Sequence, residues 1–250
     1  MKKMAVCALP ILAAMLLPAA PAPGQDSISQ WQGFSRQNFH IDGRPCFVTA
    51  PKIAAPGKPW VWRTSFPDFH AEVDLELLKN GWHVGFIDCV DMLGCDAALD
   101  LMDKFYDEAV RKRGLSAKPA LEPVSRGGMH AYRYAARRPE RVACIYADTP
   151  VMNLASWPLA HPGAKQQIQD ALRYFGLKSV DDLASFKGNP IDLLEPIAKA
   201  KIPLRHVISL DDRVVPPEQN TLEAKRRLEK LGHDIEVVEA AHGDPAAGGH

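Results

Sequence analysis

Short apolar runs alternate along much of the chain with stretches in which apolar residues recur every three or four positions. The runs fit buried strands, and the periodic stretches fit amphipathic helices. The sequence predicts strands at 60–64, 83–88, 119–121, 141–147, 204–210 and 235–239. It predicts helices at 71–80, about 97–111, 129–137, 166–175 and 218–231. This alternation is typical of an α/β domain with a mostly parallel, doubly wound sheet and helices on both faces.

Two segments depart from the alternation. Near the start, residues 37–41 and 45–50 flank Asp42-Gly43, which predicts an opening β-hairpin. Residues 151–200 show no buried-strand pattern. We expect 151–200 to form a helical lid inserted over the sheet, so that 25–250 is one domain.

The first 24 residues differ in composition from the rest. Lys2 and Lys3 precede an apolar run that ends near Ala20, and small residues follow it up to Gly24. This is the pattern of a secretory signal peptide, and the run is short for a membrane anchor. We therefore expect a secreted or periplasmic protein with no stable membrane insertion after signal cleavage.

Composition and charge narrow the function classes. The chain has 250 residues, of which 46% are hydrophobic and 24% charged, and its formal net charge is zero. These values are typical of one globular domain with a sizeable core. Because no basic stripe alternates with aromatic residues, nucleic acid is not an expected partner.

Four cysteines follow the N-terminal segment: Cys46, Cys89, Cys95 and Cys144. Cys89 and Cys95 bracket a short loop, and export would permit a disulfide between them. Unpaired thiols that serve as small apolar residues are the alternative. The spacing does not resemble the C-x-x-C pattern of metal ligands. No metal or organic cofactor is expected.

The segment 122–128, EPVSRGG, links an expected strand to an expected helix. A sharp strand-to-helix turn of the form G-x-S-x-G lifts a serine hydroxyl above the sheet edge, with a helix N-terminus behind it. Ser125 and Gly127 match this nucleophile elbow, whereas Pro123 stands where a glycine is usual. Ser125 is therefore the candidate nucleophile.

An acid and a histidine follow in the order that a triad of this kind requires. Asp211 and Asp212 end an expected strand, where acids point into the ligand crevice of a parallel sheet. His242 and His250 both follow the last expected strand. A serine becomes nucleophilic when an imidazole takes its proton, and the acid fixes the imidazole tautomer. We favour His250 as the base and retain His242 as the alternative.

Several stretches resemble the secreted bacterial α/β-hydrolases. They are WVWRT (60–64), SRGG (125–128), RVACIY (141–146), NP (189–190) and DRVVPPE (212–218). The resemblance implies the α/β-hydrolase fold, with Asp212 as the acid of the triad. It also implies further chain after the catalytic histidine, so the C-terminal end is expected to be truncated.

Other site residues follow from position in this fold. The oxyanion hole is expected to use the backbone N–H group of Arg126 and one from the loop near Thr64 and Ser65. Arg63 and Arg126 are candidates for binding an anionic or sugar-like substrate, and Trp157 for a wall of the binding site. His70 follows an expected strand and could line the pocket, although surface or capping roles are favoured for it.

The expected function is that of an exported serine hydrolase, a carboxylesterase that forms an acyl-enzyme at Ser125. The partner would be a small-molecule or carbohydrate-linked ester. Two other functions remain open: a catalytically impaired binding protein that keeps the fold, motivated by Pro123, and an acyltransferase.

Overall fold

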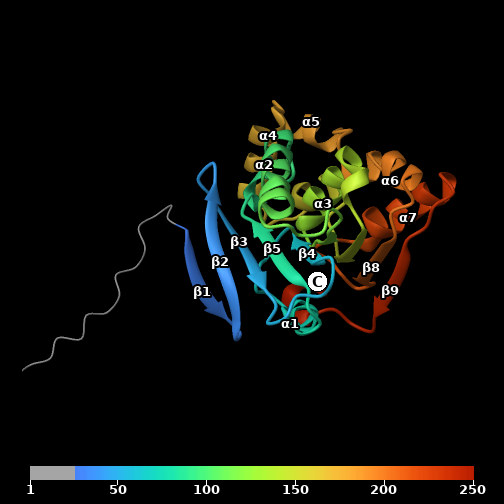
Figure 1. Cartoon of the computed structure of the whole chain (residues 1–250). Helices are drawn as coiled ribbons and strands as arrows, with labels where there is room; N and C mark the ends of the chain where they lie inside the picture. Colours follow the sequence, from blue (N-terminus) through green and yellow to red (C-terminus); the bar gives the residue numbers. More distant parts are fainter. Residues whose placement is uncertain (1–25) are drawn as a thin grey trace, which may run out of the picture.

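The computed structural model describes residues 26–250, and the expected signal peptide lies outside them. Within this range the chain forms one nine-stranded mixed sheet (Figure 1). The strands are β1 (Ser27–Trp31), β2 (Phe34–Ile41), β3 (Arg44–Ala50), β4 (Trp60–Arg63), β5 (His83–Ile87), β6 (Ala120–Glu122), β7 (Cys144–Asp148), β8 (Leu204–Ser209) and β9 (Glu236–Ala240). Their order is β1-β2-β3-β5-β4-β6-β7-β8-β9. From β5 to β9 all neighbours are parallel, whereas β1, β2, β3 and β5 pair antiparallel.

The helices alternate with the parallel strands. They are α1 (Glu72–Lys79), α2 (Asp96–Asp107), α3 (Gly127–Arg137), α4 (Lys165–Phe175), α5 (Val180–Ala184), α6 (Glu195–Lys199) and α7 (Thr221–Lys230). The expected helix at about 97–111 is α2 extended by a π-helical turn, Glu108–Lys112. Every strand and helix that the apolar pattern predicts is present, with small shifts at the ends.

The first strand was not predicted. The expected hairpin is confirmed, because β2 and β3 pair antiparallel with Ile41 opposite Arg44. Before it, β1 adds an edge strand with the sequence SISQW, which pairs with β2 and is largely exposed. The sequence SISQW shows no regular spacing of apolar residues, because pairing with the β2 backbone rather than burial holds β1 in place.

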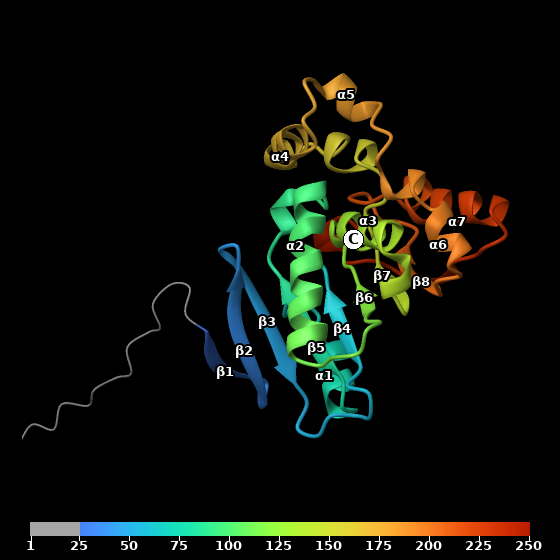
Figure 2. The same ribbon diagram turned by 45° about the horizontal axis from the view of Figure 1, so that its top comes forward.

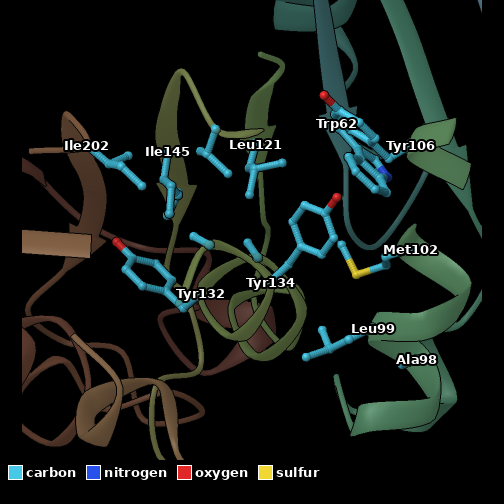
Figure 3. Packing of buried hydrophobic residues seen from close by; sticks show 14 of the residues in the cluster. Trp62, Ala98, Leu99, Met102, Tyr106, Leu121, Tyr132, Tyr134, Ile145 and Ile202 are labelled. Atoms are coloured by element: carbon cyan, nitrogen blue, oxygen red, sulfur yellow. The ribbon is translucent and has the colours of Figure 1, made fainter. Parts of the chain in front are cut away.

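The core lies mainly between the sheet and the helices α2 and α3 (Figure 3). Trp62 of β4 meets Tyr134 of α3 edge to face, with ring centroids 5.1 Å apart. Leu121 of β6 and Ile145 of β7 complete this layer. Each such side chain contributes about 1.5–3 kcal/mol through burial. On the other face, α1 packs against β4 and β5, so the parallel strands that carry the site are rigidly supported.

The lid segment, residues 151–200, contains α4, α5 and α6 and no strand. Figure 2 shows α4 and α5 set apart from the sheet. One buried side-chain amide ties the entry of this segment to the sheet domain, because Asn220 accepts from the Met152 N–H at 2.8 Å. Within the segment, the buried Asn189 amide accepts from the Leu154 N–H at 2.9 Å. The lid segment thus has a fixed attachment to the sheet domain.

All four cysteines in the described range are free thiols, so the possible Cys89–Cys95 bridge is not formed. Both side chains are buried in the core. Burial raises the pKa of the Cys89 thiol to about 12, as expected for an inert apolar thiol. Within residues 26–250, no helix is both long and apolar enough to cross a membrane.

Candidate active site

Ser125 occupies a strained turn just beyond β6. Its φ of 51° lies in the left-handed region, which costs a non-glycine residue on the order of 1–3 kcal/mol. Two backbone hydrogen bonds hold the turn: the Ser125 N–H donates to the Asp148 carbonyl at 2.9 Å, and its own carbonyl accepts from the Val151 N–H at 2.8 Å. The chain then passes directly into α3, which is the geometry of a nucleophile elbow.

The two glycines after the serine are required by close packing. A Cβ atom on Gly127 would lie 2.2 Å from the Ser65 Oγ, and one on Gly128 would lie 2.6 Å from the Val151 carbonyl oxygen. Neither contact leaves room for a side chain. The Ser-x-Gly-Gly pattern is therefore a packing requirement of the elbow.

Pro123 is accommodated where the chain leaves β6. Its carbonyl oxygen accepts from the Asp148 N–H at 2.9 Å, and Val124 forms the next bridge to β7. The elbow beyond it keeps the positive φ of Ser125 and both hydrogen bonds that hold it. The absence of the usual glycine thus leaves the backbone of the turn intact.

The loop after β4 supports the elbow through side chains. The Thr64 hydroxyl donates to the Gly127 carbonyl at 3.0 Å, and the Ser65 hydroxyl donates to the Val124 carbonyl at 2.6 Å. The Thr64 N–H donates to the Glu122 carbonyl at 3.3 Å and so extends the β4–β6 ladder. That N–H is used by the sheet, so Thr64 supports the elbow and is not available as an oxyanion donor.

Asp212 and His250 form the acid–base pair. The His250 Nδ1 lies 2.8 Å from the Asp212 Oδ2, and the acid is only 5% exposed. The other carboxylate oxygen, Oδ1, accepts from the N–H groups of Val214 and Val215, each at 2.8 Å. These two backbone donors hold the acid in one orientation, so it can fix the imidazole tautomer.

The last residues are folded back onto the strand ends. The Arg213 N–H donates to the Gly248 carbonyl at 3.0 Å, and the Gly249 N–H donates to the Asp244 carbonyl at 2.8 Å. Gly249 has a φ of 86°, and a Cβ there would lie 2.4 Å from the Asp211 carbonyl oxygen. This turn presents the His250 ring to Asp212. His242 is exposed and makes no such contact.

Ser125 and His250 line one cavity of about 440 Å³. Its walls come from the loop after β4, the ends of β7 and β8, and the segment after β9. No hydrogen bond joins Ser125 and His250 in the described part of the chain; such contacts commonly tighten only when substrate binds. The sheet edge thus brings together the predicted nucleophile, base and acid.

Three solved structures resemble the fold of this chain. S-formylglutathione hydrolase of Staphylococcus aureus matches with a TM-score of 0.63 at 13% identity, over 82% of this chain and 89% of its own. Carboxyl esterase 2 of Tuber melanosporum matches with a TM-score of 0.58 at 13% identity, over 87% and 78%. A puromycin-hydrolyzing peptidase of Mycobacterium tuberculosis matches with a TM-score of 0.63 at 14% identity. The chain has the α/β-hydrolase fold.

The match to the peptidase covers 90% of this chain but 37% of that protein, so this chain spans little more than a third of its length. No protein-family model matches the sequence, and no curated protein matches it closely enough to count as a relative. At these identities the structural matches establish the hydrolase fold alone.

Three backbone N–H groups near the nucleophile are available in this hydrolase fold. Those of Ser65, Phe66 and Arg126 donate none of the backbone hydrogen bonds formed among residues 26–250. Arg126 directly follows Ser125 at the start of α3, and Phe66 lines the cavity. The expected second donor near Thr64 and Ser65 therefore cannot be the Thr64 N–H, and Phe66 is the candidate in this loop that also lines the cavity. The sequence could not show this, because the use of each N–H depends on strand register.

Arg63 is a buried structural cation rather than a substrate-binding residue. Its side chain is 1% exposed and lies outside the walls of the serine cavity. Nη1 lies 2.8 Å from the Asp74 carboxylate and 3.4 Å from that of Glu122. Nη2 donates to the carbonyl oxygens of Phe66 and Phe69, at 3.2 and 2.8 Å. Arg63 therefore links α1, β6 and the loop that forms one wall of the cavity.

The two carboxyl groups around Arg63 have perturbed acidities. Burial, followed by the charge of Asp74, raises the pKa of Glu122 to about 8. Burial also raises the pKa of Asp74, although Arg63 opposes that shift. One guanidinium faces two buried acids, so at neutral pH the favoured state is ionised Asp74 beside protonated Glu122.

Arg126 and Trp157 lie on the lid side of the elbow. The Arg126 guanidinium lies 5.7 Å from the Trp157 ring centroid and 5.0 Å from that of Phe66, which places it between two aromatic rings. Trp157 is 8% exposed and packs within the apolar cluster of the lid segment. Neither side chain lines the serine cavity, so both remain predictions as substrate contacts.

The cavity walls include residues for which the sequence indicated no site role or favoured another role. Phe69, His70 and Asp148 all line the cavity with Ser125. His70, for which a surface or capping role was favoured, lies beside Phe69 with ring centroids 4.2 Å apart. The sequence did contain a sign that Asp148 lies at the site, because Asp148 ends an expected parallel strand just as Asp211 and Asp212 do.

Proposed function

We propose that the protein is an exported serine hydrolase that cleaves carboxylic esters through an acyl-enzyme at Ser125. The observation that carries this proposal is the 2.8 Å contact between Asp212 and His250, made at the wall of a cavity that Ser125 also lines. A strained serine elbow and an acid-oriented histidine at one sheet edge are the parts that acyl transfer needs.

In the proposed reaction, the Ser125 Oγ attacks the ester carbonyl carbon while His250 takes the hydroxyl proton. The carbonyl oxygen gains negative charge, which the N–H groups of Arg126 and Phe66 stabilise. His250 then gives its proton to the departing alkoxide, and the acyl group stays on Ser125. Water repeats these steps, which releases the acid and restores the serine. Asp212 stabilises the imidazolium throughout.

The test is hydrolysis of short p-nitrophenyl esters by the wild type and by Ser125→Ala. The serine variant should lose about 10³-fold or more in kcat/KM. A fluorophosphonate probe should label the wild type at Ser125, as read by peptide mass spectrometry, and should leave the variant unlabelled. Equal ester hydrolysis by both proteins would refute the proposal.

Two alternative functions give different results in the same experiments. A binding protein that keeps the fold without turnover would neither hydrolyse the esters nor react with the probe. An acyltransferase would label at Ser125 and would form a new ester faster than free acid when an alcohol acceptor is added. Export is tested separately, by N-terminal sequencing of the mature protein after expression with residues 1–24 present.

A further inference from the structure

Asp148 brings a carboxylate to the wall of the serine cavity, and its position relative to the nucleophile is fixed. It is the last residue of β7, and its backbone forms two hydrogen bonds with the elbow strand. Its N–H donates to the Pro123 carbonyl at 2.9 Å, and its carbonyl accepts from the Ser125 N–H at 2.9 Å. The backbones that carry the carboxylate and the nucleophile are therefore joined directly.

The Asp148 carboxylate has no protein partner. It takes part in none of the hydrogen bonds or ion pairs formed among residues 26–250, although the residue is half-buried. Burial raises the pKa of Asp148, because a carboxylate loses hydration there without gaining a donor. A ligand that brings a positive charge to this group would supply the missing interaction.

The rest of the cavity suits a cation. Among the described residues, its walls include no lysine or arginine, and their basic side chains are those of His70 and His250. The walls also include the unpaired Asp148 carboxylate and the aromatic ring of Phe69. The two nearby guanidinium groups are engaged elsewhere, Arg63 with buried carboxylates and Arg126 between two rings. Carboxylates and aromatic rings together are a common binding environment for ammonium groups.

We propose that Asp148 determines the substrate specificity of the cavity and that the preferred ester carries a cationic ammonium group. This inference rests on the proposed serine hydrolase function and adds the chemical class of its substrate. An anionic ester of the same size would place its charge against Asp148 and would be disfavoured.

The experiment compares each cationic ester with its uncharged isostere. For the alcohol side, the pair is acetylthiocholine and the thioacetate with a tert-butyl group in place of trimethylammonium. For the acyl side, the pair is the p-nitrophenyl ester of γ-trimethylammoniobutyric acid and its tert-butyl counterpart. The ratio of kcat/KM within each pair isolates the effect of the charge.

We expect the wild type to favour the cationic member of at least one pair by about tenfold at low salt, with a smaller preference as ionic strength rises. Asp148→Asn should remove most of that preference while hydrolysis of the neutral member changes little. The matched control is Asp244→Asn, because Asp244 also lines the cavity but its carboxylate already accepts from the Ala246 N–H at 2.9 Å. This variant should retain the preference.

Three outcomes would overturn the inference: a wild type with no preference in either pair, equal effects of the two variants, or an equal loss for both members of a pair in Asp148→Asn. The last outcome would show that Asp148 acts on His250 rather than on the substrate. A thermal melt of each variant confirms folding. If Ser125→Ala also hydrolysed these esters, the proposed function itself would fail, which is a separate result.

Discussion

The Arg63 guanidinium donates to the Phe69 carbonyl oxygen at 2.8 Å, and this contact connects the buried charges of the core to the wall of the active-site cavity. The same side chain holds Phe66, whose N–H is the proposed oxyanion donor. The carboxyl groups of Asp74 and Glu122 contact the Arg63 guanidinium and hold it in place. The shape of the cavity therefore depends on a side chain that does not line it.

Replacing Arg63 should affect both stability and catalysis. Arg63→Met leaves two buried carboxyl groups without their cation, which we expect to cost about 3–5 kcal/mol in free energy of unfolding. Arg63→Lys keeps the charge but lacks the planar fork that reaches Asp74 and both carbonyl groups, so kcat should fall more than stability does. Urea unfolding and ester hydrolysis measure the two effects.

The matched control for Arg63 is Arg205→Met. Arg205 pairs with Glu236 at 2.7 Å on the surface, where both side chains are more than half exposed. Such a pair contributes no more than about 1 kcal/mol. If the two methionine variants lost similar stability, the buried cluster would not have the structural role assigned to it.

Glu122 should make the protein less stable at alkaline pH. Its pKa is raised to about 8 in the folded state, against an ordinary value of 4.5. The folded protein therefore binds more protons than the unfolded chain between these values, and stability falls as pH rises through this window, by up to about 1.4 kcal/mol per pH unit. Glu122→Gln should flatten this slope in urea unfolding between pH 5 and about 8, and the exposed Glu236→Gln should not.

His206 should have the opposite effect at acid pH. The ring is fully buried between β8 and the helices, where Nδ1 lies 2.8 Å from the Thr221 Oγ1, and burial lowers its pKa to about 3. Below its ordinary value of 6.5 the unfolded chain takes up the proton first, so stability falls as pH falls toward 3. His206→Gln should reduce this acid-side slope, at some cost in stability at pH 7. The exposed His40→Gln should leave the slope unchanged.

The two candidate bases can be separated by mutation. His250→Ala should lower kcat by about 10³-fold or more, because Ser125 loses its proton acceptor, while His242→Ala should keep near-wild-type kcat. The kcat of Asp212→Asn should lie between those of the two histidine variants, because the imidazole remains but its tautomer is no longer fixed. Steady-state hydrolysis of p-nitrophenyl acetate measures all three. A larger loss in His242→Ala would reverse the assignment.

The sequence predicted the arrangement of strands and helices well where burial produces a period. Runs such as 83–88 and 204–210 are apolar because parallel strands are covered, and that pattern is local. By contrast, β1 is held mainly by backbone pairing and leaves no apolar signal. The nucleophile elbow was also predictable, because the close contacts at Gly127 and Gly128 allow no other residue.

The rest of the site depends on contacts between distant segments. The burial of Arg63 is set by Asp74 and Glu122, which the sequence alone does not place beside it. Likewise, His242 and His250 follow the same strand, and only the turn through Gly249 shows which one reaches Asp212. Such contacts depend on tertiary geometry, which composition and spacing do not encode.

The position of the lid segment has a consequence for how substrate enters. None of residues 151–200 lines the serine cavity, and the side chain of Asn220 holds the entry of this segment to the sheet domain. An ester can therefore reach Ser125 from bulk water without a conformational change of the lid segment. The proposed hydrolase should cleave dissolved ester monomers and dispersed ester droplets at similar rates, with no rise in activity at an oil–water interface.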